Sequence, residues 1–291
     1  MAYATNNGYD VFNAAMDVAA QQMITRLSPI TQVVPFQGEN MYFDDIGTIE
    51  ARRENGLNAD LQFTDIAMNR RKLTRERIYT ALIVDKLDVD ALMQDPRGQL
   101  AQACTYAHER ERDRVVYDAM FSTVYTGRNG GTPVTFATEG LTAIDATAGL
   151  TYEKLLELKQ NQIDYENEGQ LFLGITGDEH TDLMGEVELT SGDYTRQFVI
   201  EKGDIQTAAG IQLIKFGAGI TNPILETVGG ERISFAAAAG AVVFGVSSDR
   251  KIDVYPHPLK VDSTIIKVVE TVGAVRKKPF GARLQKVRLT P

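Results

Sequence analysis

The chain has 291 residues, of which 43% are hydrophobic and 24% are charged. These proportions are typical of a soluble globular protein, and the length predicts about two packed domains. A net charge of −9 and a pI near 5.0 argue against a generic nucleic-acid binder or a membrane-surface protein. The single cysteine, Cys104, excludes an internal disulfide and any zinc site built from several cysteines.

The sequence predicts no targeting or membrane-spanning segment. Residues 1–10 lack the basic start and the apolar run of a signal peptide. The most apolar stretch, residues 233–246, is shorter than the roughly 20 residues of a transmembrane helix. We therefore expect this stretch to be buried core and the protein to be made in the cytoplasm.

The N-terminal part is predicted to be an arm outside the compact core. Apolar residues recur at steps of three and four over residues 11–27, which predicts an amphipathic helix. Pro29 and Pro35 then prevent the helix from continuing.

Residues 41–85 are predicted to be extended. Asn55 and Gly56 form the dipeptide that most strongly predicts a hairpin turn, and apolar and polar residues alternate over residues 57–64. Arms of about ten residues would project roughly 30 Å. Because such a hairpin is barely stable alone in water, it must lie against a surface that this chain need not supply.

A long helix is predicted over residues 96–124. Asp95 and Pro96 provide the N-cap and the first helical position. A helix of this length would extend about 40 Å, which suggests a structural strut. Residues 108–114, HERERDR, contain no apolar side chain and place opposite charges three positions apart. We expect these turns to face solvent.

The second half is predicted to mix helices and strands and to separate charge. Residues 139–204 contain fifteen acidic and four basic residues, whereas residues 276–288 contain six basic residues and no acidic one. Thr151 and a capping box of Thr176 and Glu179 are expected to begin two helices. Strands are expected at residues 171–175, 211–216, 233–235, 242–246 and within 251–287.

The histidines do not form a catalytic or metal-binding pattern. His108 begins a sequence similar to a zinc-protease helix, but position 112 is arginine, so the second histidine ligand is missing. His180 lies in an acidic helix turn, where a surface or capping role is expected. His257 lies between two prolines, which favour a rigid loop.

Other candidate chemistry is equally incomplete. Gly217 and Gly219 lack the third glycine of a dinucleotide-binding loop. Cys104 lies on an apolar helix face, where a thiol is most often inert. We therefore predict no catalytic, cofactor-binding or metal-binding residues and no cofactor.

A basic stretch follows the predicted hairpin turn. Its cations could meet phosphates, but we favour solvated charge or pairing with acids of a neighbouring subunit. The candidate contact residues are Arg70, Arg71, Lys72, Arg75 and Arg77, together with Asn55 and Gly56 of the turn. An arm, a projecting hairpin and a strut helix, without a catalytic constellation, predict an assembly protein.

The order of these parts resembles the major capsid proteins of tailed bacteriophages, which have the Hong Kong 97-like shell fold. The resemblance covers nearly the whole chain and rests on diffuse motifs, which are ERDRVVYDAM (residues 111–120), LTYEKLLELKQ (150–160), DEHTDLM (178–184), DVYPHPLK (253–260) and ETVGAVRKKPFGARLQKV (270–287). It implies an α+β fold with an N-terminal arm (1–35), an extended β-hairpin loop (36–80), a peripheral domain (81–136 and 248–275) containing the spine helix (96–124), and an axial domain (137–247 and 276–291).

The resemblance implies a structural protein, not an enzyme, that self-assembles into pentamers and hexamers of an icosahedral phage head around double-stranded DNA. In the family the extended loop lies over the neighbouring subunit's peripheral domain, and the axial domains meet around the five- and six-fold axes. Expected partners are further copies of the chain, scaffold, portal and cement or decoration proteins, and DNA, which an acidic subunit would contact weakly and without base specificity. No membrane partner is expected. The expected location is the virion capsid, after synthesis in the host cytoplasm.

One departure from the family and two alternatives remain. Some family members cross-link a loop lysine to an asparagine, but residues 37–71 contain no lysine, so this cross-link is not expected. A nanocompartment shell protein of the same fold would enclose an enzyme in place of DNA. A soluble α/β enzyme would use Asp178, Glu179 and His180, and would not form large uniform particles.

Overall fold

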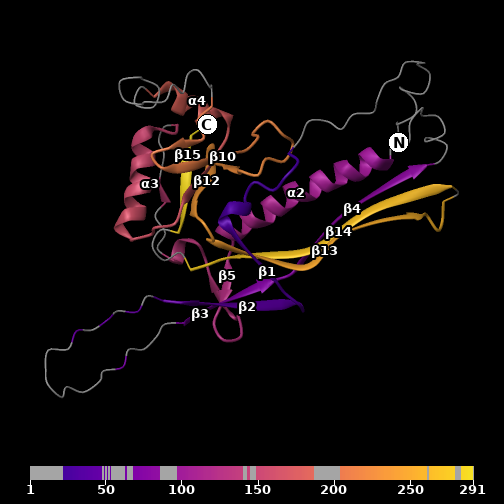
Figure 1. Ribbon diagram of the computed structural model, residues 1–291, viewed down its shortest axis with the longest axis horizontal. Coiled ribbons are helices and arrows are strands. Elements are labelled where there is room, and N and C mark those ends of the chain that lie inside the picture. Colours follow the sequence, from indigo (N-terminus) through magenta and orange to yellow (C-terminus); the bar gives the residue numbers. More distant parts are fainter. Residues whose placement is uncertain are drawn as a thin grey trace.

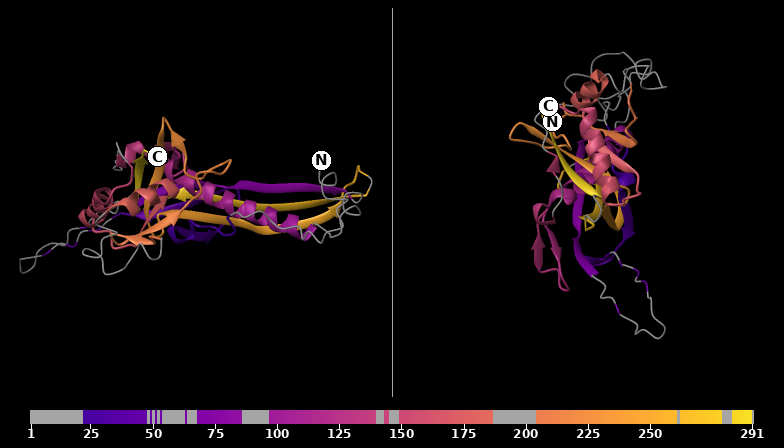
Figure 2. Two further views of the ribbon diagram at one scale, coloured as in Figure 1. Left: turned by 90° about the horizontal axis from the view of Figure 1, so that it is seen from above. Right: turned by 90° about the vertical axis from the view of Figure 1, so that its left-hand side faces the viewer.

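The computed structural model describes residues 22–47, 49, 51, 53, 63, 68–85, 97–139, 143–144, 149–186, 204–260, 262–278 and 283–290. These residues form an elongated molecule, with a packed body of sheet and helices at one end and a long, narrow sheet backed by one helix at the other (Figures 1 and 2). The mixture of helices and separate sheets confirms the α+β class. Within the described part, no helix is long and apolar enough to span a membrane.

The narrow end is built on two long antiparallel strands, β13 (Val242–Pro256) and β14 (Ser263–Arg276). β4 (Glu76–Asp85) pairs with β14, and β1 (Thr31–Pro35) pairs in parallel with the first half of β13. The helix α2 (Arg97–Phe121) lies along this long sheet (Figure 1). Its 25 residues extend about 38 Å. The predicted spine helix is confirmed, although its expected start at Asp95 and Pro96 lies outside the described residues.

The body centres on a second sheet with the strand order β7-β15-β12-β8-β10-β9, in which β11 also pairs with β12. Its strands are β7 (Ala143–Ile144), β8 (Leu171–Ile175), β9 (Thr207–Ala208), β10 (Ile211–Lys215), β11 (Thr227–Val228), β12 (Glu231–Ala238) and β15 (Leu284–Leu289). The helices α3 (Tyr152–Asp164) and α4 (Gly177–Gly185) pack on one face of this sheet, and the last turns of α2 pack on the other. The expected helix starts after Thr151 and Thr176 are confirmed, although the Thr151 side chain makes no capping hydrogen bond.

Burial on both faces explains the apolar strands of the body. Leu171 and Leu173 pack in the cluster beside α3 and α4, whereas Phe172 between them packs in the cluster that contains Met120 of α2. A strand covered on both sides needs an apolar side chain at every position. The same α2 cluster includes Phe235 of β12, so the expected peripheral and axial domains share a core, and the division between them remains a prediction.

The predicted hairpin begins as a regular antiparallel pair. β2 (Asn40–Ile46) pairs with β3 (Met68–Thr74) along the whole length of both strands. β5 (Val124–Thr126) and β6 (Thr132–Val134) extend the pair to a four-stranded hairpin sheet with the order β2-β3-β5-β6. The Asn55–Gly56 turn lies outside the described residues.

A pair of glycines allows the hairpin to cross the long sheet. Gly245 of β13 lies opposite Gly273 of β14. A Cβ atom on Gly273 would lie 2.5 Å from the carbonyl oxygen of Thr74, and one on Gly245 would lie 2.8 Å from the Phe36 ring. Because no side chain fits in these spaces, the two glycines determine where the hairpin meets the long sheet.

The N-terminal segment differs from its prediction. Residues 1–21 of the expected helix and arm lie outside the described residues, and residues 22–27 are not helical. Leu27 and Ile30, on either side of the start of the short 3-10 helix η1 (Ser28–Ile30), are fully buried in the core. Asp113 of α2 holds this segment in place, because its carboxylate accepts the backbone N–H groups of Arg26 and Leu27 at 2.9 and 3.0 Å. The end of the expected arm is therefore part of the core.

The prediction that residues 108–114 face solvent is wrong. His108 and Asp113 are fully buried. Arg112 donates from Nε to both carboxylate oxygens of Glu270 on β14, at 2.9 and 3.1 Å, and Glu270 is itself fully buried. The charged turns of α2 therefore lie against charged residues of the long sheet. The sequence of the helix alone does not show that Glu270 is the partner of Arg112.

Glu109 shows the same pattern. It pairs with Arg250 of β13 at 2.7 Å. Glu111 and Arg114 do pair within the helix, at 3.0 Å. The helix is thus held to the long sheet by ion pairs over a stretch that contains no apolar residue.

Candidate functional site

The side chains that most often carry chemistry have structural roles. The described residues contain no group of three or more His, Cys, Asp or Glu side chains placed to bind a metal ion. Cys104 is buried, and burial raises the pKa of its thiol, which lowers its reactivity. His257 Nδ1 accepts the N–H groups of Leu259 and Lys260 at 3.0 and 3.1 Å. The expected loop follows β13 at His257, and these hydrogen bonds hold its turn.

The Asp178–Glu179–His180 cluster stabilises the start of α4. Glu179 accepts the Thr176 N–H at 2.7 Å, as the predicted capping box requires, and pairs with Arg232 of β12 at 2.6 Å. His180 Nε2 accepts the Ile205 N–H at 3.2 Å, and burial lowers the pKa of this histidine. These contacts cap a helix and join it to the sheet.

The basic stretch of β3 alternates between the two faces of the hairpin sheet. Arg70 pairs with Asp44 directly opposite on β2, with its Nε and Nη2 at 2.7 and 2.8 Å from the two carboxylate oxygens. The hydrogen bonds from Arg70 hold the pKa of Asp44 below its usual value. Arg71 points to the other face and is only 2% exposed. Two adjacent arginines thus have different roles, because successive strand residues face opposite sides.

Arg71 belongs to a buried ion group with Glu139 and Arg276. Its Nη2 pairs with one carboxylate oxygen of Glu139 in the short 3-10 helix η2 (Ala137–Glu139), and its Nη1 donates to the backbone oxygen of Arg276 at 3.2 Å. Arg276 Nε donates to the other carboxylate oxygen at 3.1 Å. The three side chains are 2%, 6% and 0% exposed. The group joins the hairpin, η2 and the end of β14.

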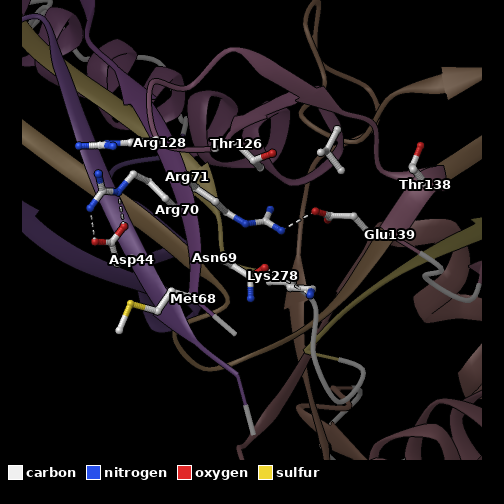
Figure 3. A pocket seen from close by; sticks show the side chains of 12 residues that line it. Asp44, Met68, Asn69, Arg70, Arg71, Thr126, Arg128, Thr138, Glu139 and Lys278 are labelled. Carbon is white, nitrogen blue, oxygen red and sulfur yellow. Dashed lines mark hydrogen bonds and ion pairs between the residues drawn. The ribbon is translucent and has the colours of Figure 1, made fainter. Parts of the chain in front are cut away.

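A cleft of about 720 Å³ lies beside this ion group (Figure 3). Figure 3 shows Arg71 reaching from β3 toward Glu139, whereas Arg70 turns to Asp44 on the neighbouring strand. The cleft is lined by Asp44, Met68, Asn69, Arg70, Arg71, Thr126, Gly127, Arg128, Val134, Thr138, Glu139 and Lys278. We call the part of the hairpin where β3 meets η2 and the end of β14 the hairpin root. The hairpin root is held by the buried ion group and has the cleft on one side.

The other predicted contact residues do not gather at this cleft. Lys72 is half-buried on β3, whereas Arg75, which follows that strand, and Arg77 of β4 are exposed. Asn55 and Gly56 lie outside the described residues. The structure therefore brings together Arg70 and Arg71 and leaves Arg75 and Arg77 on the surface.

One face of the long sheet has exposed apolar side chains. Its far half carries Tyr79 of β4, Ile265 and Val269 of β14, and Tyr255 of β13, which strand alternation and register place on one side. Tyr79 is 69% exposed and Tyr255 is 39% exposed. We call this side, on which Arg77 also lies, the open face.

The opposite side of the same sheet is covered only in part, because Ile252 and Val254 of β13 lie on it by register and are 50% and 55% exposed. Ile266 and Val268 of β14 are fully buried, on the side where Glu270 meets α2. The burial of β14 on this side and the exposure of Tyr79 on the open face indicate that the open face is a docking surface.

Sequence reasoning missed Glu139, Arg276, Arg128 and Lys278. Arg71 lies 68 residues from Glu139 and 205 from Arg276, so no local pattern could have joined them. The only sequence feature that points to the site is the absence of acidic residues from residues 276–288.

Comparisons with known proteins agree with this architecture. The sequence matches the phage capsid protein family over residues 4–282. No curated protein matches it. Among solved structures, the capsid of the cyanophage P-SCSP1u is 13% identical with a TM-score of 0.71, over 96% of this chain and 92% of that one.

Two further capsids show the same similarity. The mature capsid of bacteriophage PhiM1 is 12% identical with a TM-score of 0.68, over 97% of this chain and 91% of that one. The capsid of the cyanophage Pam1 is 12% identical with a TM-score of 0.65, over 97% and 98% of the two chains. The expected Hong Kong 97-like shell fold is confirmed, and the family match spans almost the entire sequence. The chain belongs to the phage capsid protein family.

Proposed function

We propose that this capsid protein is the major subunit of an icosahedral phage head and assembles into its pentamers and hexamers around double-stranded DNA. The hairpin of one copy lies over the open face of the next, and the packed bodies meet around the five- and six-fold axes. Scaffold, portal and cement or decoration proteins act with it after its synthesis in the host cytoplasm. Its contact with DNA is local and independent of base sequence, because the subunit carries a net charge of −9.

The observation that supports this arrangement most is the open face. A single tyrosine or isoleucine that moves from water into a contact contributes about 1.5–3 kcal/mol. The open face offers several such side chains in adjacent register, with Tyr79 69% exposed. A projecting hairpin is barely stable alone, and the open face exposes apolar side chains. The hairpin of one copy can therefore cover the open face of the next.

The basic residues have a narrower role in this proposal than the sequence suggested. Arg75 and Arg77 are exposed and can pair with acids of a neighbouring copy. Arg71 has its carboxylate partner inside the chain, in Glu139. Reversing Arg71 to Glu would place two buried carboxylates side by side and disturb the fold, so Arg75 and Arg77 are the positions at which charge reversal tests assembly.

Electron microscopy of the purified protein tests the proposal. The wild type should form large uniform closed particles. Tyr79→Glu should reduce their yield by at least about tenfold, because it places a charge in a contact that excludes water. Tyr79→Phe keeps the ring and should assemble like the wild type. Circular dichroism should show the same folded content in all three proteins.

Two outcomes would contradict the proposal. Normal particles from Tyr79→Glu would show that the open face is not the contact. A wild type that forms only a small defined oligomer would exclude a shell. Nuclease-resistant DNA in particles from phage-infected cells distinguishes a phage head from a nanocompartment shell, which would contain an enzyme.

A further inference from the structure

The cleft at the hairpin root has an excess of positive charge. Its positively charged side chains, labelled in Figure 3, come from β3, from the turn between β5 and β6, and from the segment after β14. The lining includes the four cations Arg70, Arg71, Arg128 and Lys278 and the two acids Asp44 and Glu139. We call this site the cationic cleft.

Both acids of the cationic cleft already pair with arginines. Asp44 accepts two hydrogen bonds from Arg70, and Glu139 is shared by Arg71 and Arg276. Arg276 adds a fifth cation from behind the lining, so these five cations and two acids sum to +3 among the described residues. The whole chain has a charge of −9, so the remainder of the chain carries −12.

The cations of this region also crowd one another. Burial and the like charge of Arg283 lower the pKa of Lys277, which precedes Lys278, and Asp45 offsets this only in part. Burial lowers the pKa of Arg276; Glu139 opposes this shift, and the charge of Arg71 adds to it. The Nε atom of Arg71 is buried without a hydrogen-bond partner among the described residues. The guanidinium of Arg71 therefore keeps one donor that its partners among the described residues do not use, and Lys278 donates to Asn69 at 3.4 Å.

A carboxylate from a second copy fits these features best. Arginine and lysine side chains bind carboxylates through charge-assisted hydrogen bonds. The chain supplies many such groups, since residues 139–204 contain fifteen acids and four bases. Glu153, Glu157 and Asp164 of α3 are among those exposed at the surface. The cleft lies at the base of the hairpin, which the proposed function directs toward a neighbouring copy.

We propose that the cationic cleft is an inter-subunit site that binds acidic side chains of a second copy of this chain. This inference rests on the proposed function and adds a contact at the opposite end of the hairpin from its turn. Arg128 and Lys278 are its recognition residues, and the buried group of Arg71, Glu139 and Arg276 holds the cleft in shape. The bound carboxylates lower the repulsion between the cations. Assembly of the copies therefore stabilises the position of the hairpin.

Zero-length cross-linking of assembled particles tests this site. A carbodiimide joins a lysine amine to a carboxylate as an amide and takes up the released water to become a urea. Particles built from a mixture of ¹⁴N- and ¹⁵N-labelled subunits distinguish links between copies from links within one copy. We expect mass spectrometry to find mixed-isotope peptides that join Lys278 to an aspartate or glutamate.

A charge-reversed variant provides the second measurement. Arg128→Glu with Lys278→Glu should lower particle yield by at least about tenfold, because like charges then face each other across the contact. Arg128→Lys with Lys278→Arg keeps the charge and should assemble normally. Circular dichroism of the unassembled subunits should show the same folded content in both variants and in the wild type, because Arg128 is exposed and Lys278 is only half-buried.

The outcomes separate this inference from the proposed function. Wild-type shells without mixed-isotope links at Lys278, or normal shells from the charge-reversed variant, would overturn the inference and leave the proposed function standing. Protection of Lys278 only in DNA-filled particles would also overturn it and would assign the cleft to phosphate. A wild type that stays monomeric under all conditions would overturn both.

Discussion

Glu139 is the residue whose loss most directly tests how the hairpin root is held. Glu139→Gln keeps the size of the side chain and removes the one negative charge between Arg71 and Arg276. Both arginines would stay buried, since they are 2% and 0% exposed. Burial already lowers the pKa of Arg276, and Glu139 opposes that shift. Removing one partner of a buried ion pair costs about 3–5 kcal/mol, and we expect the upper part of this range because Glu139 serves two arginines.

Urea unfolding of the unassembled subunit, followed by circular dichroism, measures this loss. Glu157→Gln on the exposed side of α3 is the matched control and should change the free energy of unfolding by no more than about 0.5 kcal/mol. Adding Arg71→Met to Glu139→Gln should recover part of the loss, because it removes one of the charges left unpaired.

A loss below about 1 kcal/mol for Glu139→Gln would refute this reasoning. It would mean that water solvates the two arginines and that the ion group does not fix the hairpin root. No recovery in the double variant would show that the loss comes from packing and not from charge.

Three further predictions follow from the same structure. Gly273→Ala should destabilise the subunit by about 1–3 kcal/mol in urea unfolding, because its Cβ would lie 2.5 Å from the Thr74 carbonyl oxygen; an unchanged stability would contradict the close crossing. Burial raises the pKa of Glu270, but His108, Arg112 and Arg250 outweigh burial and leave it below its usual value. The stability from Glu270 should therefore be complete above its unfolded-state pKa and be lost as pH falls through the lower folded-state pKa; acid titration of Glu270→Gln should lack this loss, and an identical acid profile would count against it. Because residues 37–71 contain no lysine, mature particles boiled in detergent should give single chains on gels, and a ladder of covalent oligomers would disprove the expectation.

Local patterns were sufficient for the helices α3 and α4, for the longer strands of the body and for the long helix, but not for the two-residue strands β7, β9 and β11. The strand Leu171–Ile175 and the capping box of Thr176 and Glu179 occur where the sequence predicts them. Their determinants lie within a few residues of one another, so a short window of sequence contains the whole physical cause. The order of parts along the chain also indicated the family.

The charged side chains could not be placed in this way. Residues 108–114 have the composition of a solvent-facing helix, yet Arg112 pairs with Glu270, 158 residues away. Arg70 and Arg71 are adjacent and chemically identical, but only Arg71 is buried, and its partner Glu139 is 68 residues away. Neither the burial nor the partner follows from the local sequence.

The sequence by itself determined the helices, the buried strands, the extended hairpin and the kind of protein that these parts make. Only the tertiary structure decided which charges lie inside, which face of the long sheet is left open and where positive charge accumulates. The physical reason is distance along the chain. Apolar periodicity and helix caps act between near neighbours, whereas a buried ion pair exists only after folding has brought remote segments together.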